Sequence, residues 1–174
     1  MVSARPITEL EGAILSEIHH RGHDTAFQVR RAFAASFSLE WKGSAGAVYP
    51  AVKRLERDGL IHAGPAEGGR NTRRLSLTAD GVAALNAWAG DAGLATSVGV
   101  DPFRLRSGIW TLLPVEERRA LFARLEAEIA ASLAQLQGYA AATDPVERLR
   151  VELCVAVQQA RRDQLRRWMD GGEM

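Results

Sequence analysis

Apolar residues recur at intervals of three and four along most of the chain, a spacing that predicts a mainly helical protein. The first helix is expected over about residues 9–20, with Ile14 and Ile18 on its apolar side. Thr8 and Glu11 match a capping box, in which the threonine caps the helix and the glutamate reaches back to the cap. A second helix is expected to begin at Thr25. Its candidate core residues are Phe27, Val29, Phe33 and Phe37.

The segment 41–60 predicts a third helix with two distinct sides. Ser44 is expected to cap it, and Gly59 to end it, because glycine readily enters the left-handed conformation that follows a helix. Three apolar positions at helical spacing form the core side: Val48, Val52 and Leu55. Three cations fall outside that stripe: Lys53, Arg54 and Arg57. Three short helices of which the last is basic indicate a helix-turn-helix.

A β-hairpin is predicted directly after this helix. Apolar residues suit a strand at 60–63 and a second at 75–77, and the segment 65–74 between them is polar and rich in glycine. A hairpin in this place is a wing. Gly69 would let its tip approach DNA closely, and Arg70 and Arg73 suit phosphates or a narrow minor groove.

The remainder of the chain predicts further helices. Thr78 is expected to cap a fourth helix, residues 93–100 have the composition of a linker, and two long amphipathic helices meet at Asp144 and Pro145. We therefore expect a mainly α fold with a small β-hairpin: a winged helix-turn-helix DNA-binding domain over 1–91 and an antiparallel helical hairpin over 92–174. Apolar residues of the last helix are expected to support homodimerisation: Leu149, Leu153, Val157, Leu165 and Trp168.

The chain as a whole is nearly neutral, and only one segment of it carries the excess positive charge expected of a polyanion-binding surface. The formal net charge of the chain is +1, whereas seven cationic and three anionic side chains lie between Lys42 and Arg74. Cys154 is the single cysteine, which excludes an intrachain disulfide, and its apolar neighbours favour burial over reactivity. The N-terminus lacks the apolar core of a signal peptide, and no run is long enough to span a bilayer. A cytoplasmic, nucleoid-associated protein is expected.

Other candidate sites are weaker. Histidines at 19, 20, 23 and 62 could suggest a metal site, but no cysteine or carboxylate pattern supports one, and a polar loop explains them better. Neither a catalytic constellation nor a phosphate-binding glycine loop is recognisable, so neither an enzyme nor a bound cofactor is expected. Trp88, Phe103 and Trp110 could line a pocket for a small hydrophobic ligand, or they could fill a core.

If the third helix enters the major groove, its N-terminal half is the part expected to read bases. That half offers Ser44, Gly46 and Tyr49, whereas Arg54 and Arg57 are expected to meet phosphates. A weakly charged module gains affinity by pairing with a second copy, so a homodimer on a palindromic operator in double-stranded DNA is expected. The alternative is a winged-helix module that binds proteins without specific DNA binding.

Three segments resemble the PadR family of winged-helix transcriptional regulators: ITELEGAIL near the start, SAGAVYPAVKRLERDGLI in the third helix and EGGRNTRRLSLTADGVAAL through the wing. The resemblance covers about residues 5–90, and the run from Tyr49 to Glu56 is its most specific part. The family usually opens its second helix with a Gly-Tyr-Glu-Leu-like run, so Phe27 lacks the usual hydroxyl. The resemblance implies a repressor that is relieved by a small hydrophobic or phenolic ligand. The C-terminal helices resemble those of the larger subgroup, in which this region dimerises.

Overall fold

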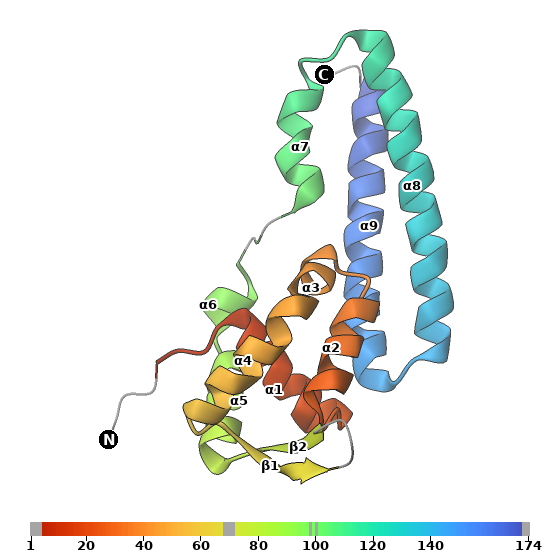
Figure 1. Cartoon of the computed structure of the whole chain (residues 1–174). Helices are drawn as coiled ribbons and strands as arrows, with labels where there is room; N and C mark the ends of the chain where they lie inside the picture. The colour runs from red at the N-terminus through yellow and green to blue at the C-terminus, as the bar shows by residue number, and fades with distance from the viewer. Residues whose placement is uncertain (1–4, 68–71, 98, 100, 172–174) are drawn as a thin grey trace. The chain divides into compact units, whose positions relative to one another are not determined.

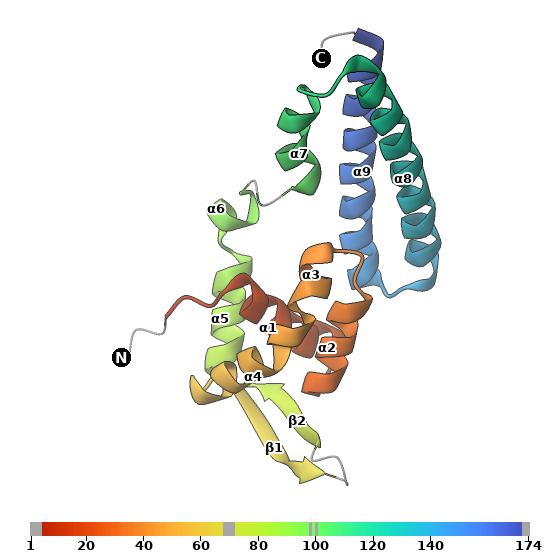
Figure 2. The same ribbon diagram turned by 45° about the horizontal axis from the view of Figure 1, so that its top comes forward.

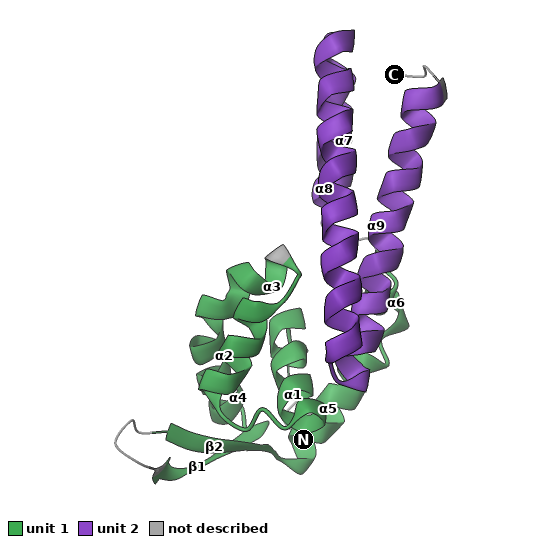
Figure 3. Cartoon of the chain, turned by 90° about the vertical axis from the view of Figure 1, so that its right-hand side faces the viewer, with its two compact units in different colours: residues 1–97 green, residues 98–174 purple. Residues whose placement is uncertain are grey.

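A computed structural model describes residues 5–67, 72–97, 99 and 101–171. The chain is mainly helical with one two-stranded antiparallel sheet, which confirms the predicted fold class (Figure 1). It divides into two compact units, Met1–Ser97 and Val98–Met174 (Figure 3). The first unit includes the short helix α6 (Ala92–Ala95), so the division falls beyond the expected boundary between residues 91 and 92.

The first two helices begin where their caps predict. In α1 (Glu9–Arg21), the Thr8 hydroxyl accepts a hydrogen bond from the Glu11 amide, and the Glu11 carboxylate accepts one from the Thr8 amide, which confirms the capping box. In α2 (Ala26–Ala35), the Thr25 hydroxyl accepts a hydrogen bond from the Gln28 amide. Both helices therefore have part of their unpaired first turn satisfied by side chains.

The predicted third helix is broken into three pieces. Ser38 caps α3 (Leu39–Ser44), a 3₁₀ turn follows (η1, Ala45–Ala47), and α4 runs over Val48–Arg57. The expectation that Ser44 caps this helix was wrong, because Ser44 ends α3 and makes no capping hydrogen bond. Gly43, Ser44 and Gly46 are poor helix formers, and their run explains the break. At the other end of α4, Gly59 has the expected left-handed conformation, with φ of 73°.

The hairpin pairs β1 (Ile61–Glu67) with β2 (Thr72–Leu77) in antiparallel register (Figure 2). Ile61 faces Leu77, and the register shifts between Ala63 and Ala66. The strands extend further than the sequence predicted, so Arg73 belongs to a strand and not to the loop at the tip.

One apolar core holds the first unit together. It includes the predicted stripe of α4 and residues of α1, α2 and the hairpin. Phe27 is an exception, because its side chain is 54% exposed although its spacing predicted burial. Helix α5 (Ala79–Ala89) packs closely on α1: a Cβ atom placed on Gly12 would lie 2.4 Å from the indole ring of Trp88. Glycine at position 12 thus allows these two helices to approach each other.

The second unit consists of α7 (Pro102–Trp110), α8 (Val115–Ala142) and α9 (Pro145–Gly171). Helices α8 and α9 pack side by side as the predicted helical hairpin (Figures 1 and 2). The stripe of α8 is buried at Ile129, Leu133 and Leu136. Across the described ranges, none of the helices combines the length and the apolar character required to cross a membrane.

Candidate nucleic-acid interface

A cleft of about 510 Å³ opens in the first unit between the start of α2, the outer face of α4 and the hairpin. Its floor is largely apolar and includes Val52, Ala63 and Leu75. Aromatic, hydroxyl and charged side chains complete its lining: Thr25, Phe27, Tyr49, Lys53, Glu56, Thr72 and Arg73. The cleft therefore joins part of the predicted recognition surface to the base of the wing.

The outer face of α4 displays an aromatic residue and a cation one turn apart. Tyr49 is 45% exposed and Lys53 is exposed, while the neighbouring Val48 and Val52 are buried. Among the residues that the structure describes, Lys53 has neither a hydrogen-bond partner nor an ion-pair partner. Its ammonium group is thus available to an external anion.

Before α4, the break in the helix changes the setting of two predicted base-reading residues. Ser44 ends α3 and is half-buried, whereas Gly46 lies in η1 and is exposed. No atom lies within 4 Å of the position where Gly46 would carry a Cβ, so the backbone is open on that side. Gly46 therefore leaves room for a close neighbour.

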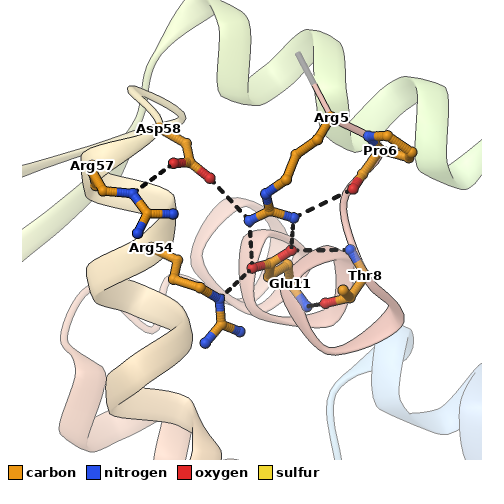
Figure 4. Close-up of polar contacts among 7 residues, drawn as sticks. All are labelled: Arg5, Pro6, Thr8, Glu11, Arg54, Arg57 and Asp58. Atoms are coloured by element: carbon orange, nitrogen blue, oxygen red, sulfur yellow. Dashed lines mark hydrogen bonds and ion pairs between the residues drawn. The ribbon is translucent and has the colours of Figure 1, made fainter.

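The Nε of Arg54, a residue expected to meet phosphate, is bonded to Glu11 of α1, while the side chain of Arg54 remains 39% exposed (Figure 4). Its Nε donates to the buried Glu11 carboxylate at 3.0 Å, and Arg5 donates to the same carboxylate through two nitrogens at 2.8 Å each. Hydrogen bonds from Arg5, the Thr8 amide and Arg54 lower the pKa of Glu11 to about 2, against the opposing effect of burial. Glu11 thus fixes the orientation of Arg54 on α4.

Arg57 ends α4 at the solvent. Its Nε donates to Asp58 at 3.0 Å, and Asp58 also accepts a hydrogen bond from Arg5 at 2.9 Å (Figure 4). These contacts hold the pKa of Asp58 below its usual value, with the Arg57 hydrogen bond as the largest cause. The side chain of Arg57 remains 69% exposed, so it can still reach an external anion.

In the wing, Gly69 and Arg70 lie outside the described residues. Arg73 folds back onto its own hairpin and onto α4: it donates to the carbonyls of Ala63 and Gly64 and pairs with the Glu56 carboxylate. Its neighbour Arg74 pairs with Asp24 in the loop between α1 and α2. Both described arginines of β2 thus bind the hairpin to the helices.

Two exposed cations of α2 were missed from the sequence. Arg30 and Arg31 follow Phe27 by three and four positions, so they share its exposed face, which also borders the cleft. Within the described ranges, neither arginine forms an ion pair or a side-chain hydrogen bond. The spacing of the two arginines from Phe27 could have placed all three on one exposed face, but Phe27 was predicted to lie in the core.

The predicted dimerisation residues of α9 divide into two groups. Leu149, Leu153 and Val157 form an exposed stripe, with Leu153 65% exposed. Leu165 is fully buried, and Trp168 packs beside it in the core of the second unit. The second pair therefore stabilises the unit itself.

The three predicted pocket residues belong to two separate cores. Trp88 packs in the first unit, where its Nε1 donates to Glu9 at 3.1 Å. Phe103 and Trp110 belong to an aromatic cluster in the second unit, in which Phe103 stacks on Trp168 at a centroid distance of 5.8 Å. As for metals, the described part of the chain holds no group of three or more His, Cys, Asp or Glu side chains suited to an ion.

Comparisons with known proteins agree with this architecture. Residues 14–87 match the model of the Transcriptional regulator PadR-like family. Among solved structures, PadR from Bacillus subtilis in complex with operator DNA has a TM-score of 0.75 at 20% identity, covering 91% of this chain and 96% of the other. The same protein in complex with p-coumaric acid has a TM-score of 0.70 at 20% identity, covering 90% and 91%.

A third structure is that of the virulence activator AphA from Vibrio cholerae, with a TM-score of 0.65 at 23% identity, covering 90% of this chain and 94% of the other. At these identities the likenesses establish the fold. The comparison with curated proteins found no match.

Proposed function

The N-terminal unit of the chain belongs to the PadR-like family of transcriptional regulators, and from this premise we propose that the protein is a sequence-specific DNA-binding regulator acting as a homodimer. The observation that carries the proposal is the cleft between α4 and the wing, with Lys53, unpaired among the described residues, in its lining. An α-helix fits the major groove and a wing reaches the neighbouring minor groove, so one DNA backbone passes between them. Because the cleft lies between these two elements, we propose that the backbone passes along it.

In this arrangement, the exposed residues have different roles. Gly46 and Tyr49 face the bases or sugars, because they lie at the N-terminal part of the inserted segment. Lys53, together with Arg30 and Arg31 of α2, meets phosphates, which supply affinity without sequence information. We expect the tip of the hairpin to enter the minor groove.

The test is the affinity for the DNA upstream of the protein's own gene, measured by fluorescence anisotropy over a range of salt concentrations. Each lost phosphate contact is expected to reduce the slope of log K against log salt by about 0.9. Lys53→Ala should therefore weaken binding and flatten the slope. Arg124→Ala removes an exposed cation of α8 and is the matched control, with no expected change. Equal slopes for the wild type and the Lys53 variant would refute the assignment.

The homodimer is proposed to form through the exposed stripe of α9, since Leu149, Leu153 and Val157 lie on one face at four-residue spacing. Leu153→Glu is expected to shift sedimentation from a dimer to a monomer, because it would bury an unpaired charge in the interface. Gln159→Glu introduces the same charge elsewhere on the exposed surface of α9 and should leave the dimer intact. A monomeric wild type, or a dimeric Leu153→Glu, would contradict the proposal.

We further propose that the protein represses transcription and that a small hydrophobic ligand relieves repression. The motivation is the aromatic cluster of the second unit, where the half-buried Phe103 and Trp168 stack. A ligand inserted there should change tryptophan fluorescence and lower DNA affinity in the same titration. A reporter gene fused to the regulated promoter distinguishes repression from activation. Reporter expression must rise when the gene of this protein is deleted, and a fall would identify an activator.

A second candidate function is a protein-interaction module. It is favoured by the pairing of Arg54 and Arg73 with carboxylates of the chain, which reduces the positive charge that these two residues offer to DNA. This alternative predicts that DNA affinity is weak and nearly independent of sequence. The affinity measurement above distinguishes the two functions when the upstream DNA is compared with a scrambled duplex.

A further inference from the structure

We propose that Arg73 and Glu56 form a clasp that fixes the wing to α4 and sets the width of the cleft between them. In this assignment Arg73 is a positioning residue and not a phosphate contact, although its position in a wing suggests the latter. The inference rests on the proposed function. It adds that the distance between α4 and the wing is already fixed in the free protein, before DNA binds.

All three nitrogens of the Arg73 guanidinium donate hydrogen bonds. Nε of Arg73 donates to the Gly64 carbonyl at 2.8 Å, and Nη2 donates to the Ala63 carbonyl at 2.6 Å. The same Nη2 lies 2.8 Å from Oε1 of Glu56, and Nη1 donates to Oε2 at 3.2 Å. Such a fork-to-fork pair fixes both distance and orientation. One side chain of β2 therefore connects β1 to α4.

The two carbonyls lie in the irregular stretch of the hairpin. The register shifts between Ala63 and Ala66, and a shift of this kind interrupts the ladder of backbone hydrogen bonds. Arg73 donates hydrogen bonds to carbonyls at that interruption, so it links the irregular part of β1 to α4. A lysine has a single ammonium group and cannot reproduce the fork.

The opposite side of the hairpin has its own attachment. The amide of Leu75 donates to the Asp24 carbonyl at 2.7 Å, and Arg74 pairs with the Asp24 carboxylate. The wing is thus held from two directions, by Glu56 on α4 and by Asp24 before α2. Because Glu56 and Arg73 both line the cleft, loss of their ion pair would change the shape of the cleft. A wing that is already fixed in position loses less conformational entropy when DNA binds.

The clasp is exposed enough to be altered without unfolding the protein. The side chains of Arg73 and Glu56 are 43% and 34% exposed, and ion pairs at such positions contribute little to stability. Glu56→Gln keeps the shape and removes the charge. It is the decisive variant, because the loss of an anion beside DNA would by electrostatics alone tighten binding.

The experiment measures the affinity for upstream DNA against salt for the wild type, Glu56→Gln, Arg73→Ala, Arg73→Lys and the double variant Glu56→Gln/Arg73→Ala. The clasp predicts that each single variant loses about tenfold in affinity through lost preorganisation, with the salt slope unchanged. The double variant should lose no more than Arg73→Ala, since both substitutions break the same contact. Hydrogen exchange of the β1 amides should accelerate in each variant.

Two results would overturn the clasp. The first is tighter binding by Glu56→Gln. The second is a slope reduced by about 0.9 in Arg73→Ala, which would make Arg73 a phosphate contact. Failure of the proposed function is a different result: the wild type itself would then bind the upstream DNA no better than scrambled DNA. In that case the proposed role of the clasp in DNA binding is refuted as well, whatever the hydrogen exchange of the β1 amides shows.

Discussion

Replacing Glu11 with glutamine tests how α4, the helix proposed to face DNA, is held in place. The Glu11 carboxylate is fully buried and accepts hydrogen bonds from Arg5, Arg54 and the Thr8 amide. Glutamine retains one acceptor oxygen and presents an amide donor to a guanidinium. The two arginines would lose their common anion, and Arg54 would lose its fixed orientation on α4.

The structure gives the size of the effect. A carboxyl pKa lowered from 4.5 to about 2 corresponds to a contribution of about 3 kcal/mol to the free energy of unfolding. The arginines that pair with it are 43% and 39% exposed, so water can solvate them in the variant. We therefore expect Glu11→Gln to lower the free energy of unfolding by about 2–3 kcal/mol at pH 7.

The sign of the pH dependence follows from the lowered pKa of Glu11. Its contribution is fully present above about pH 4.5 and is lost as the pH falls toward 2, where the wild-type carboxyl becomes neutral. Urea unfolding followed through the backbone amide NMR signals of α1 and α4 reports on this unit directly. The difference in the free energy of unfolding between wild type and Glu11→Gln should become smaller through that pH range. The control variant Glu40→Gln, at an exposed site of α3, should differ little from the wild type at any pH. A difference between wild type and Glu11→Gln that stays constant down to pH 2 would refute the reasoning.

Further predictions concern packing and reactivity. Gly81→Ala should destabilise the first unit by about 2 kcal/mol or more in thermal unfolding, because the new Cβ would lie 1.9 Å from the Leu60 carbonyl oxygen. Gly43→Ala, at a helical position with nothing within 4 Å, should instead leave the midpoint unchanged or raise it. Cys154 should react slowly with a thiol reagent at pH 7.5 in the folded protein and quickly in urea, since burial, assisted by the charge of Glu147, raises the pKa of its thiol.

The fold was predictable where local chemistry and apolar spacing agree. The capping residues Thr8, Thr25 and Thr78 each mark a helix start, because a hydroxyl that caps a first turn acts within a few residues. The break between α3 and α4 was missed because the apolar stripe that predicted the helix begins only after the break, at Val48. Periodicity alone gives no weight to the weak helix formers that precede this residue.

The candidate site was less predictable, because the availability of a charge depends on distant partners. Arg54 and Arg73 have the sequence pattern of phosphate contacts, yet each meets a carboxylate from another element. Glu11 lies 43 positions before Arg54, and no local pattern indicates that pairing. Phe27 shows the converse case: its spacing suits the core, but α2 turns this residue toward the cleft.

The junction at the end of α4 has a mechanical consequence. The Thr78 hydroxyl donates to the Gly59 carbonyl at 2.7 Å, the Thr78 amide donates to the Leu60 carbonyl, and Gly81 leaves room for that carbonyl. The end of α4, the first residue of the wing and the first turn of α5 therefore move as one body. A displacement of α5 would therefore be passed to α4 and to the wing together. Under the proposed function, such a displacement would change the angle at which α4 and the wing meet a DNA groove.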